Sequence, residues 1–157
     1  MNVNKEEALK KLNELKCEFD KKQSELRRII EQPCRDIKDV IKSYEDACLI
    51  INRKILTIND FNIFDCKDRN FQYYTHRIAT IIEALNEGWE PNFNDTNQKK
   101  WYPYFDMRNS CTFFASSYFS WCVTGVGFSG RLYLKNKELS DYLGTHFINE
   151  FKNLNNK

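Results

Sequence analysis

Residues 100–135, KWYPYFDMRNSCTFFASSYFSWCVTGVGFSGRLYLK, decide the fold class. Within them, residues 100–107, 111–123 and 130–135 are rich in aromatic and β-branched side chains, a composition that favours strands. Short polar and glycine-rich turns separate these segments, and strands joined by short turns pair in antiparallel order. The sequence therefore predicts a small antiparallel β-meander over residues 99–135.

A helix is expected after the strands. Asn136 is a favourable N-cap residue, and apolar side chains recur after it at helical spacing. The stripe consists of Leu139, Leu143, Phe147, Phe151 and Leu154. We expect one helix over residues 137–153 that covers one face of the sheet. A small sheet with helices segregated from it belongs to the α+β class.

Helices are also expected before the strands. Apolar residues at helical spacing predict a long helix over residues 70–87, with Gly88 as its left-handed cap. Shorter helical pieces are predicted within residues 36–51, one of which opens at Ser43. Residues 52–68 contain several Asn and Asp residues and keep no sustained period, so we expect a loop there.

A heptad stripe runs along the N-terminal segment. Asn4 and Glu7 predict a capping box, and apolar residues then recur at alternating steps of four and three, interrupted by Lys22. Such a stripe needs a partner, because an isolated helix would leave it in water. We therefore predict a coiled-coil-like helix over residues 1–32, followed by one α+β domain over residues 33–157.

Either a second copy of the chain or the later helices can supply the partner of this stripe. We expect a homo-oligomer. The expected oligomerisation contacts are Leu12, Leu15, Phe19, Leu26 and Ile29.

Length and charge limit the classes of function. A chain of 157 residues has room for one ordinary domain or a small domain with a helical extension. Its net charge of +2 is too low for nucleic-acid binding by bulk charge, so any basic site would be local. The first 16 residues are charged throughout, and no run of about 18 apolar residues occurs. We expect no membrane association and a location in a cytoplasm.

Catalytic and metal-binding signatures are weak. Six cysteines without an export signal are expected to be reduced thiols, and no C-x-x-C pair is present. The two histidines, His76 and His146, join no local signature with a Cys or Ser nucleophile, and no carboxylate pair is distinctive. We therefore expect a protein that is not an enzyme, with no catalytic residues, no metal site and no cofactor.

Two motifs that look chemical are interpreted as turns. GVGFSG, residues 125–130, has the letters of a dinucleotide fingerprint, but a predicted strand follows it where that fingerprint needs a helix. Arg131 follows directly and could hold a phosphate together with neighbouring backbone N–H groups. NFNDTN, residues 92–97, lacks the central glycine and closing glutamate of a calcium loop.

Aromatic residues are the strongest positive signal, since they make up 15% of the chain and concentrate after Phe71. Strict alternation along the central strand would place Phe114 and Tyr118 on one side, among small hydroxyl residues, and Phe113 and Phe119 on the other. The side with Phe114 and Tyr118 could stack a base. The alternatives are a two-sided core or a protein interface.

Basic residues border this aromatic surface. Lys99 and Lys100 precede Trp101 and Tyr104, and a cation beside exposed rings is the combination that binds nucleotides and single strands. The predicted ligand-binding residues are Lys99, Lys100, Trp101, Tyr104, Phe114, Tyr118 and Arg131.

Three segments resemble a group of small proteins from phages and prophages of gut bacteria: SYEDACLII (43–51), IIEALNEGWEPNFNDTNQKKWYPYF (81–105) and GFSGRLYLKNKELSDYLGTHFINEFKN (127–153). The distinctive pieces are ALNEGW-x-P, K-x-Y-P-x-F, and G-R-L leading into E-L-x-x-Y-x-G. Proteins of this group usually have V-G-S-R-L where this chain has GFSGRL, residues 127–132. The resemblance implies a mobile-element accessory gene acting in the host bacterial cytoplasm, and it implies no mechanism.

Two hypotheses follow. In the first, a non-enzymatic phage accessory protein, acting in counter-defence, holds a nucleotide or nucleic acid on an aromatic and basic sheet face. In the second, a structural or host-protein-blocking oligomer, such as a virion component or an inhibitor, assembles by its coiled coil and grips a protein through its aromatic residues.

Overall fold

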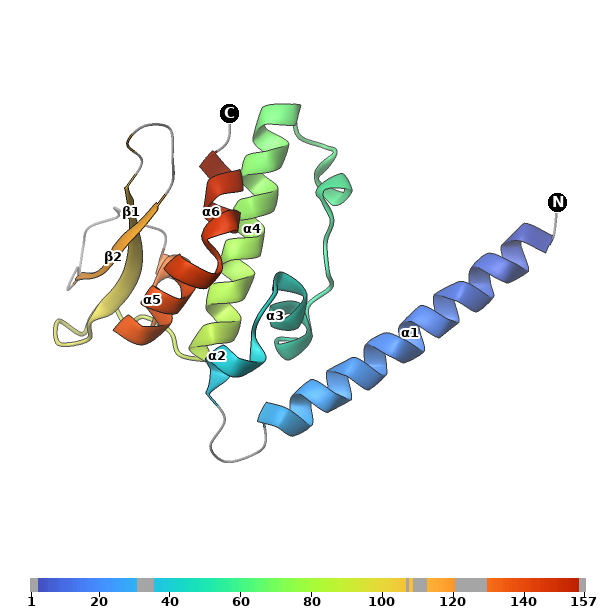
Figure 1. The fold of residues 1–157 in the computed structure, drawn as a ribbon, viewed down its shortest axis with the longest axis horizontal. Coiled ribbons are helices and arrows are strands. Elements are labelled where there is room, and N and C mark those ends of the chain that lie inside the picture. The colour runs from blue at the N-terminus through green and yellow to red at the C-terminus, as the bar shows by residue number, and fades with distance from the viewer. Residues whose placement is uncertain (1–2, 31–35, 107, 109–112, 121–129, 156–157) are drawn as a thin grey trace. The chain divides into compact units, whose positions relative to one another are not determined.

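The computed structural model describes residues 3–30, 36–106, 108, 113–120 and 130–155. The chain divides into two compact units, Met1–Val40 and Ile41–Lys157, each considered by itself. The first unit contains helices α1 (Val3–Ile30) and α2 (Ile37–Val40). The predicted long N-terminal helix is thus present (Figure 1). It begins at Val3, so Asn4 lies within the helix and does not precede it.

The heptad stripe on α1 includes exposed leucines. Leu12 and Leu15 are 62% and 60% exposed. Phe19 and Leu26 are partly exposed, while the side chain of Ile29 lies outside the described part of the chain.

The second unit holds the sheet and the remaining helices. Helix α4 lies beside α3 and α6, and α5 packs on both strands (Figure 1). In chain order the elements are α3 (Tyr44–Ile50), η1 (Ile58–Phe61), α4 (Cys66–Asn86), β1 (Lys100–Asp106), β2 (Phe113–Ser120), η3 (Gly130–Leu132), α5 (Lys137–His146) and α6 (Ile148–Asn155). The α+β class is confirmed.

Local sequence signals position several helix ends. Ser43 accepts a hydrogen bond from the Asp46 N–H at 3.1 Å, and Asn136 accepts one from the Leu139 N–H at 2.9 Å, as the N-cap prediction requires. Helix α4 ends differently from the prediction. Glu87 takes the left-handed cap position with φ 50°, and Gly88 follows with φ 81°.

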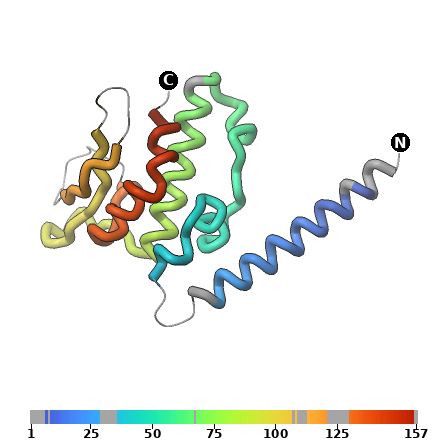
Figure 2. The backbone as a smooth tube through the Cα atoms, in the orientation of Figure 1, coloured from blue at the N-terminus to red at the C-terminus, as the bar shows by residue number. Residues whose placement is uncertain are grey.

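The core lies where helix stripes meet. Its most enclosed members include Ile81, Ile82 and Leu85 of α4 and Leu143 of α5. The helix predicted over 137–153 is in fact two helices that join at Phe147 (Figure 2). The break lets α5 cover the sheet while α6 packs on α4.

The described sheet has two strands, so the predicted meander is wrong in its third strand. In place of a strand over residues 130–135, the chain forms η3 and a single bridge between Leu134 and Trp101. The two backbone hydrogen bonds of this bridge have nitrogen–oxygen distances of 3.0 and 2.8 Å. The physical reason is that η3 ends at Leu132 and α5 has its N-cap at Asn136, which leaves only residues 133–135 extended between them. On the side of this segment away from β1, the side chain of Asn86 donates to the Tyr133 carbonyl at 2.8 Å and accepts from the Lys135 N–H at 3.1 Å.

Candidate functional site

A β-bulge in β2 decides which aromatic rings reach the surface. Strands β1 and β2 pair Tyr102 with Tyr118 and Tyr104 with Ser116, after which the register shifts and Phe105 pairs with Phe114. Ala115 is therefore the extra residue. A bulge places residues on its two sides out of strict alternation, so Phe114 and Tyr118 lie on opposite faces.

Contacts with α5 confirm the inner position of Phe114. The Phe114 ring packs so closely on Gly144 that a Cβ built there would lie 2.1 Å from its Cδ2. Ser117 also faces this helix, because its hydroxyl lies 2.7 Å from the Ser140 hydroxyl. The prediction that Phe114 shares an open stacking platform with Tyr118 is wrong, since the bulge places Phe114 on the face of the sheet that packs on α5.

The opposite face of the sheet carries exposed rings. Tyr104, Tyr118 and Phe113 are 52%, 51% and 59% exposed. The Tyr104 and Tyr118 rings meet edge to face, with centroids 5.2 Å apart. By register Phe113 lies opposite Asp106, on the same side as Tyr104. We call Tyr104, Phe113 and Tyr118 the outer tyrosine face.

Trp101 and Lys99 belong to a different cluster. Trp101 is partly buried and packs against Phe119, its register partner, at 5.0 Å between ring centroids. The Lys99 ammonium lies 4.9 Å from the Phe119 ring centroid. Trp101 has the same strand parity as Pro103, whose partner Ser117 faces α5. Trp101 and its cation are therefore separated from the outer tyrosine face by the sheet itself.

Lys100 cannot serve as the predicted phosphate contact. It is fully buried, and its ammonium donates to the Gln98 carbonyl at 3.0 Å and the Asp95 carbonyl at 3.3 Å. The same ammonium lies 5.6 Å from the centroid of the Phe93 ring. The turn before β1 thus encloses this charge, and the role of Lys100 is to hold that turn.

Arg131 lies in a recess formed by the end of α4, the segment after it and η3. Its side chain is 72% exposed, and one guanidinium nitrogen lies 3.3 Å from Glu83. The recess has a volume of about 550 Å³. Aromatic and charged side chains line it, among them Trp89, Phe93, Tyr133, Glu83, Glu90 and Arg131. No residue of β1 or β2 is part of this lining.

The seven predicted ligand-binding residues therefore do not form one site. Tyr104 and Tyr118 share the outer tyrosine face, whereas Phe114 faces α5 and Lys100 is buried. Trp101 lies with Lys99 on the other side of the sheet, and Arg131 occupies its own recess.

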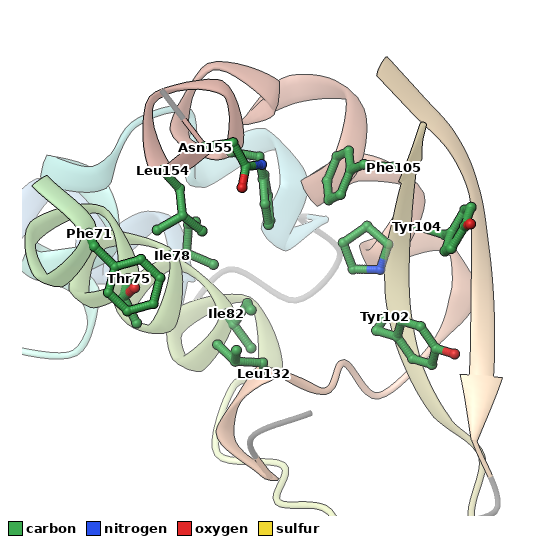
Figure 3. A pocket seen from close by; sticks show the side chains of 12 residues that line it. Phe71, Thr75, Ile78, Ile82, Tyr102, Tyr104, Phe105, Leu132, Leu154 and Asn155 are labelled. Atoms are coloured by element: carbon green, nitrogen blue, oxygen red, sulfur yellow. The ribbon is translucent and has the colours of Figure 1, made fainter. Parts of the chain in front are cut away.

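An apolar cavity of about 460 Å³ lies between α4, α6 and β1, and no sequence pattern predicted it. Figure 3 shows Phe71, Ile78 and Ile82 on the helical side and Phe105 on the strand side. The Thr75 hydroxyl also lines this cavity; it is buried and has no hydrogen-bond partner among the described residues. Side chains from distant segments form the cavity, so no local motif could signal it.

Both histidines make structural contacts. The His76 ring packs near Tyr44 and Phe61, at 6.2 and 5.9 Å between centroids. Burial lowers the pKa of His76 below the usual histidine value, and the nearby positive charge of Arg53 lowers it further. His146 stacks on Tyr142 at 4.9 Å, and its Nε2 lies 3.1 Å from the Lys42 carbonyl.

Cation-binding groups are dispersed in the ranges that the structure describes. No three residues of the types His, Cys, Asp and Glu gather there as a metal site would require. The cysteines in these ranges, Cys17, Cys48 and Cys66, are free thiols. No described helix combines the length and the apolar character needed to cross a membrane.

Comparisons with protein-family models, with curated proteins and with solved structures give no match for this chain. The fold and the surfaces define a small α+β protein with an exposed helical stripe, and its function has to be argued from the geometry of those surfaces.

Proposed function

We propose that this chain is a non-enzymatic accessory protein of phage origin that self-assembles through α1 and binds a host protein through the outer tyrosine face. The observation that carries the proposal is the exposed, mutually packed pair Tyr104 and Tyr118 beside Phe113. Exposed aromatic residues that already pack on one another lose little side-chain entropy on binding, and tyrosine is enriched in the energetic centres of protein interfaces.

The distribution of cations favours a protein over a nucleic acid on this face. Arg108, at the strand end, is engaged by Asp106, with its Nε 2.8 and 3.0 Å from the two carboxylate oxygens. These hydrogen bonds lower the pKa of Asp106 to about 2. Lys100 is buried and Lys99 lies over Phe119. A single-stranded nucleic acid could stack its bases on the outer tyrosine face, but it would lack there the phosphate contacts that dominate the affinity of proteins for nucleic acids.

Assembly is supported by the stripe on α1. Leu12 and Leu15 leave apolar area in water in the isolated chain, and packing against a second copy would cover it.

Two measurements test the proposal. Deleting residues 1–32 should convert the oligomer to a monomer in light scattering while the remainder still unfolds cooperatively. The protein carrying Tyr104→Ser and Tyr118→Ser should lose one specific host protein that the unchanged chain retains. Ile63→Ser, at an exposed apolar residue of the loop before α4, is the matched control. Equal retention by the double variant and the control would contradict the role of the outer tyrosine face.

A second candidate function, nucleotide binding, keeps one specific observation in its favour. Arg131, predicted from the sequence to meet phosphate, shares its recess with the half-buried ring of Trp89. This recess differs from the sheet face on which the sequence suggested such binding.

A further inference from the structure

We propose that the recess around Trp89 and Arg131 is a nucleotide site, in which Trp89 stacks the base and Arg131 holds the phosphate. The inference rests on the second candidate function and moves it from the sheet to a different part of the fold. The volume of about 550 Å³ is suitable, because small-molecule sites span roughly 300–1,000 Å³.

Arg131 is the cationic side chain in the lining of the recess, which also contains the carboxylates of Glu83 and Glu90. Glu83 receives two hydrogen bonds of 2.9 Å from Arg53, one to each carboxylate oxygen, and a longer contact of 3.3 Å from Arg131. Two guanidinium groups therefore share the carboxylate of Glu83 at this end of the recess. Because Arg53 satisfies Glu83 alone, Arg131 can turn to an incoming phosphate without leaving Glu83 unpaired.

Packing and hydrogen bonds hold the backbone on either side of Arg131. A Cβ at Gly130 would lie 3.0 Å from the Phe93 ring, so this glycine allows η3 to approach the ring closely. The side chain of Asn86 holds the chain two to four residues later, through Tyr133 and Lys135. Arg131 thus projects from a segment that is held on both sides, which lowers the entropy cost of binding.

The aromatic part of the recess favours a planar ligand. The Phe93 ring is 36% exposed; the Lys100 ammonium lies 5.6 Å from its centroid, and the Tyr133 ring lies 6.1 Å away between centroids. Trp89 is partly exposed, directly after the left-handed turn at Glu87 and Gly88. An indole of this kind offers a stacking surface for a base. The exposed carboxylate of Glu90 also lines the recess and can accept a hydrogen bond from an N–H group of that base.

Calorimetric titration of the full chain with GMP, AMP, UMP and inorganic phosphate, at low and high salt, tests the site. We expect at least one nucleotide to bind in a salt-sensitive manner and phosphate alone to bind much more weakly. Arg131→Gln should weaken nucleotide binding about tenfold or more, since a charge-assisted hydrogen bond is lost. Arg108→Gln, at another exposed arginine with a carboxylate partner, is the matched control and should leave the affinity unchanged.

Trp89→Leu should remove the advantage of a nucleotide over phosphate. If this variant melts at a lower temperature, Trp89→Phe provides a second test, because it keeps a ring and should keep most of the affinity. Absence of binding by every nucleotide, equal affinity for phosphate and nucleotide, or equal losses in Arg131→Gln and Arg108→Gln would overturn the inference. Light scattering on the same samples separates this failure from failure of the first proposed function, since assembly through α1 does not depend on the recess.

Discussion

Gly144 shows how one residue makes room for a ring. This glycine lies inside α5, where alanine would ordinarily favour the helix by roughly 1 kcal/mol. Its position against Phe114 reverses that expectation, because a Cβ would meet ring atoms at 2.1 and 2.4 Å. The preference for glycine here comes from the packing of the sheet on the helix and not from a special backbone angle.

We expect Gly144→Ala to destabilise the protein by about 1–3 kcal/mol, as overpacking of a core does. Adding Phe114→Leu should restore part of that loss. Gly88→Ala is the matched control: its added Cβ contacts nothing within 4 Å, and its cost comes from φ 81°. Chemical denaturation of the unchanged protein, of the three single variants and of the two double variants that contain Phe114→Leu measures both effects. Rescue of Gly88→Ala by Phe114→Leu would contradict this account.

Lys100 illustrates a charge that serves the structure. Its hydrogen bonds to the Asp95 and Gln98 carbonyls hold the turn that leads into β1. We expect Lys100→Met to lower the free energy of unfolding by about 1–3 kcal/mol, because two charge-assisted hydrogen bonds disappear. Lys99→Met, at the exposed neighbour, should change it by no more than about 0.5 kcal/mol. Equal effects in denaturant titrations would show that Lys100 is not buried.

At the scale of elements, α1 combines a regular sequence pattern with an exposed stripe. The pattern of apolar residues continues through Leu26, but it is interrupted by Lys22, a residue type that lowers stability while restricting register in coiled coils. Two parallel copies in register would place the two Lys22 residues opposite each other. An antiparallel pair avoids this repulsion.

We predict that Leu12→Lys abolishes self-association, because it places a charge in the stripe. Asn13→Lys adds the same charge one residue away, off the stripe, and should leave assembly intact. Analytical ultracentrifugation over a range of concentrations compares the two variants. A monomeric unchanged protein, or equal behaviour of both variants, would show that the stripe is not the assembly surface.

Local signals predicted elements better than they predicted contacts. Ser43 and Asn136 cap helices as expected, because a cap depends on only four neighbouring residues. The third strand failed because the 3-10 turn of η3 and the helix cap at Asn136 leave only residues 133–135 extended between them. The bulge at Ala115 had no visible signal, because Ala115 and the following Ser116 and Ser117 are small residues that fit either pairing. The candidate site depended on that bulge, so its residues were predicted with the wrong neighbours.

Across the whole second unit, α4 connects the other layers. Arg77 of this helix donates to Glu150 of α6 at 2.7 and 2.8 Å, and its guanidinium lies 4.2 Å from the ring centroid of Tyr44 in α3. Arg53, in the loop after α3, reaches Thr80 and Glu83 on the same helix at 2.9 Å. We expect long-range ties of this kind to make the unit unfold cooperatively, as one body.

His76 makes that unfolding sensitive to pH. Its folded pKa is lowered by burial, so the unfolded chain binds a proton more readily than the folded chain. Its contribution to stability is therefore complete above the ordinary histidine pKa of about 6.5 and declines as the pH falls below that value. Thermal melts between pH 8 and pH 5 should show this decline, and His76→Phe should reduce its slope. An unchanged slope in the variant would contradict the assignment.

The bulge also determines which single-residue deletion the two strands can tolerate. Ala115 has no opposite residue of its own, so its removal would leave Phe114 facing α5 and Tyr118 facing outward, with a straight ladder between them. Removal of Tyr102 from the partner strand would move every β1 side chain on one side of the deletion to the opposite face of the sheet. A shortened chain lacking Ala115 should therefore fold with its aromatic residues in place, as a near-normal thermal melt and unchanged near-ultraviolet circular dichroism would show, whereas the chain lacking Tyr102 should not.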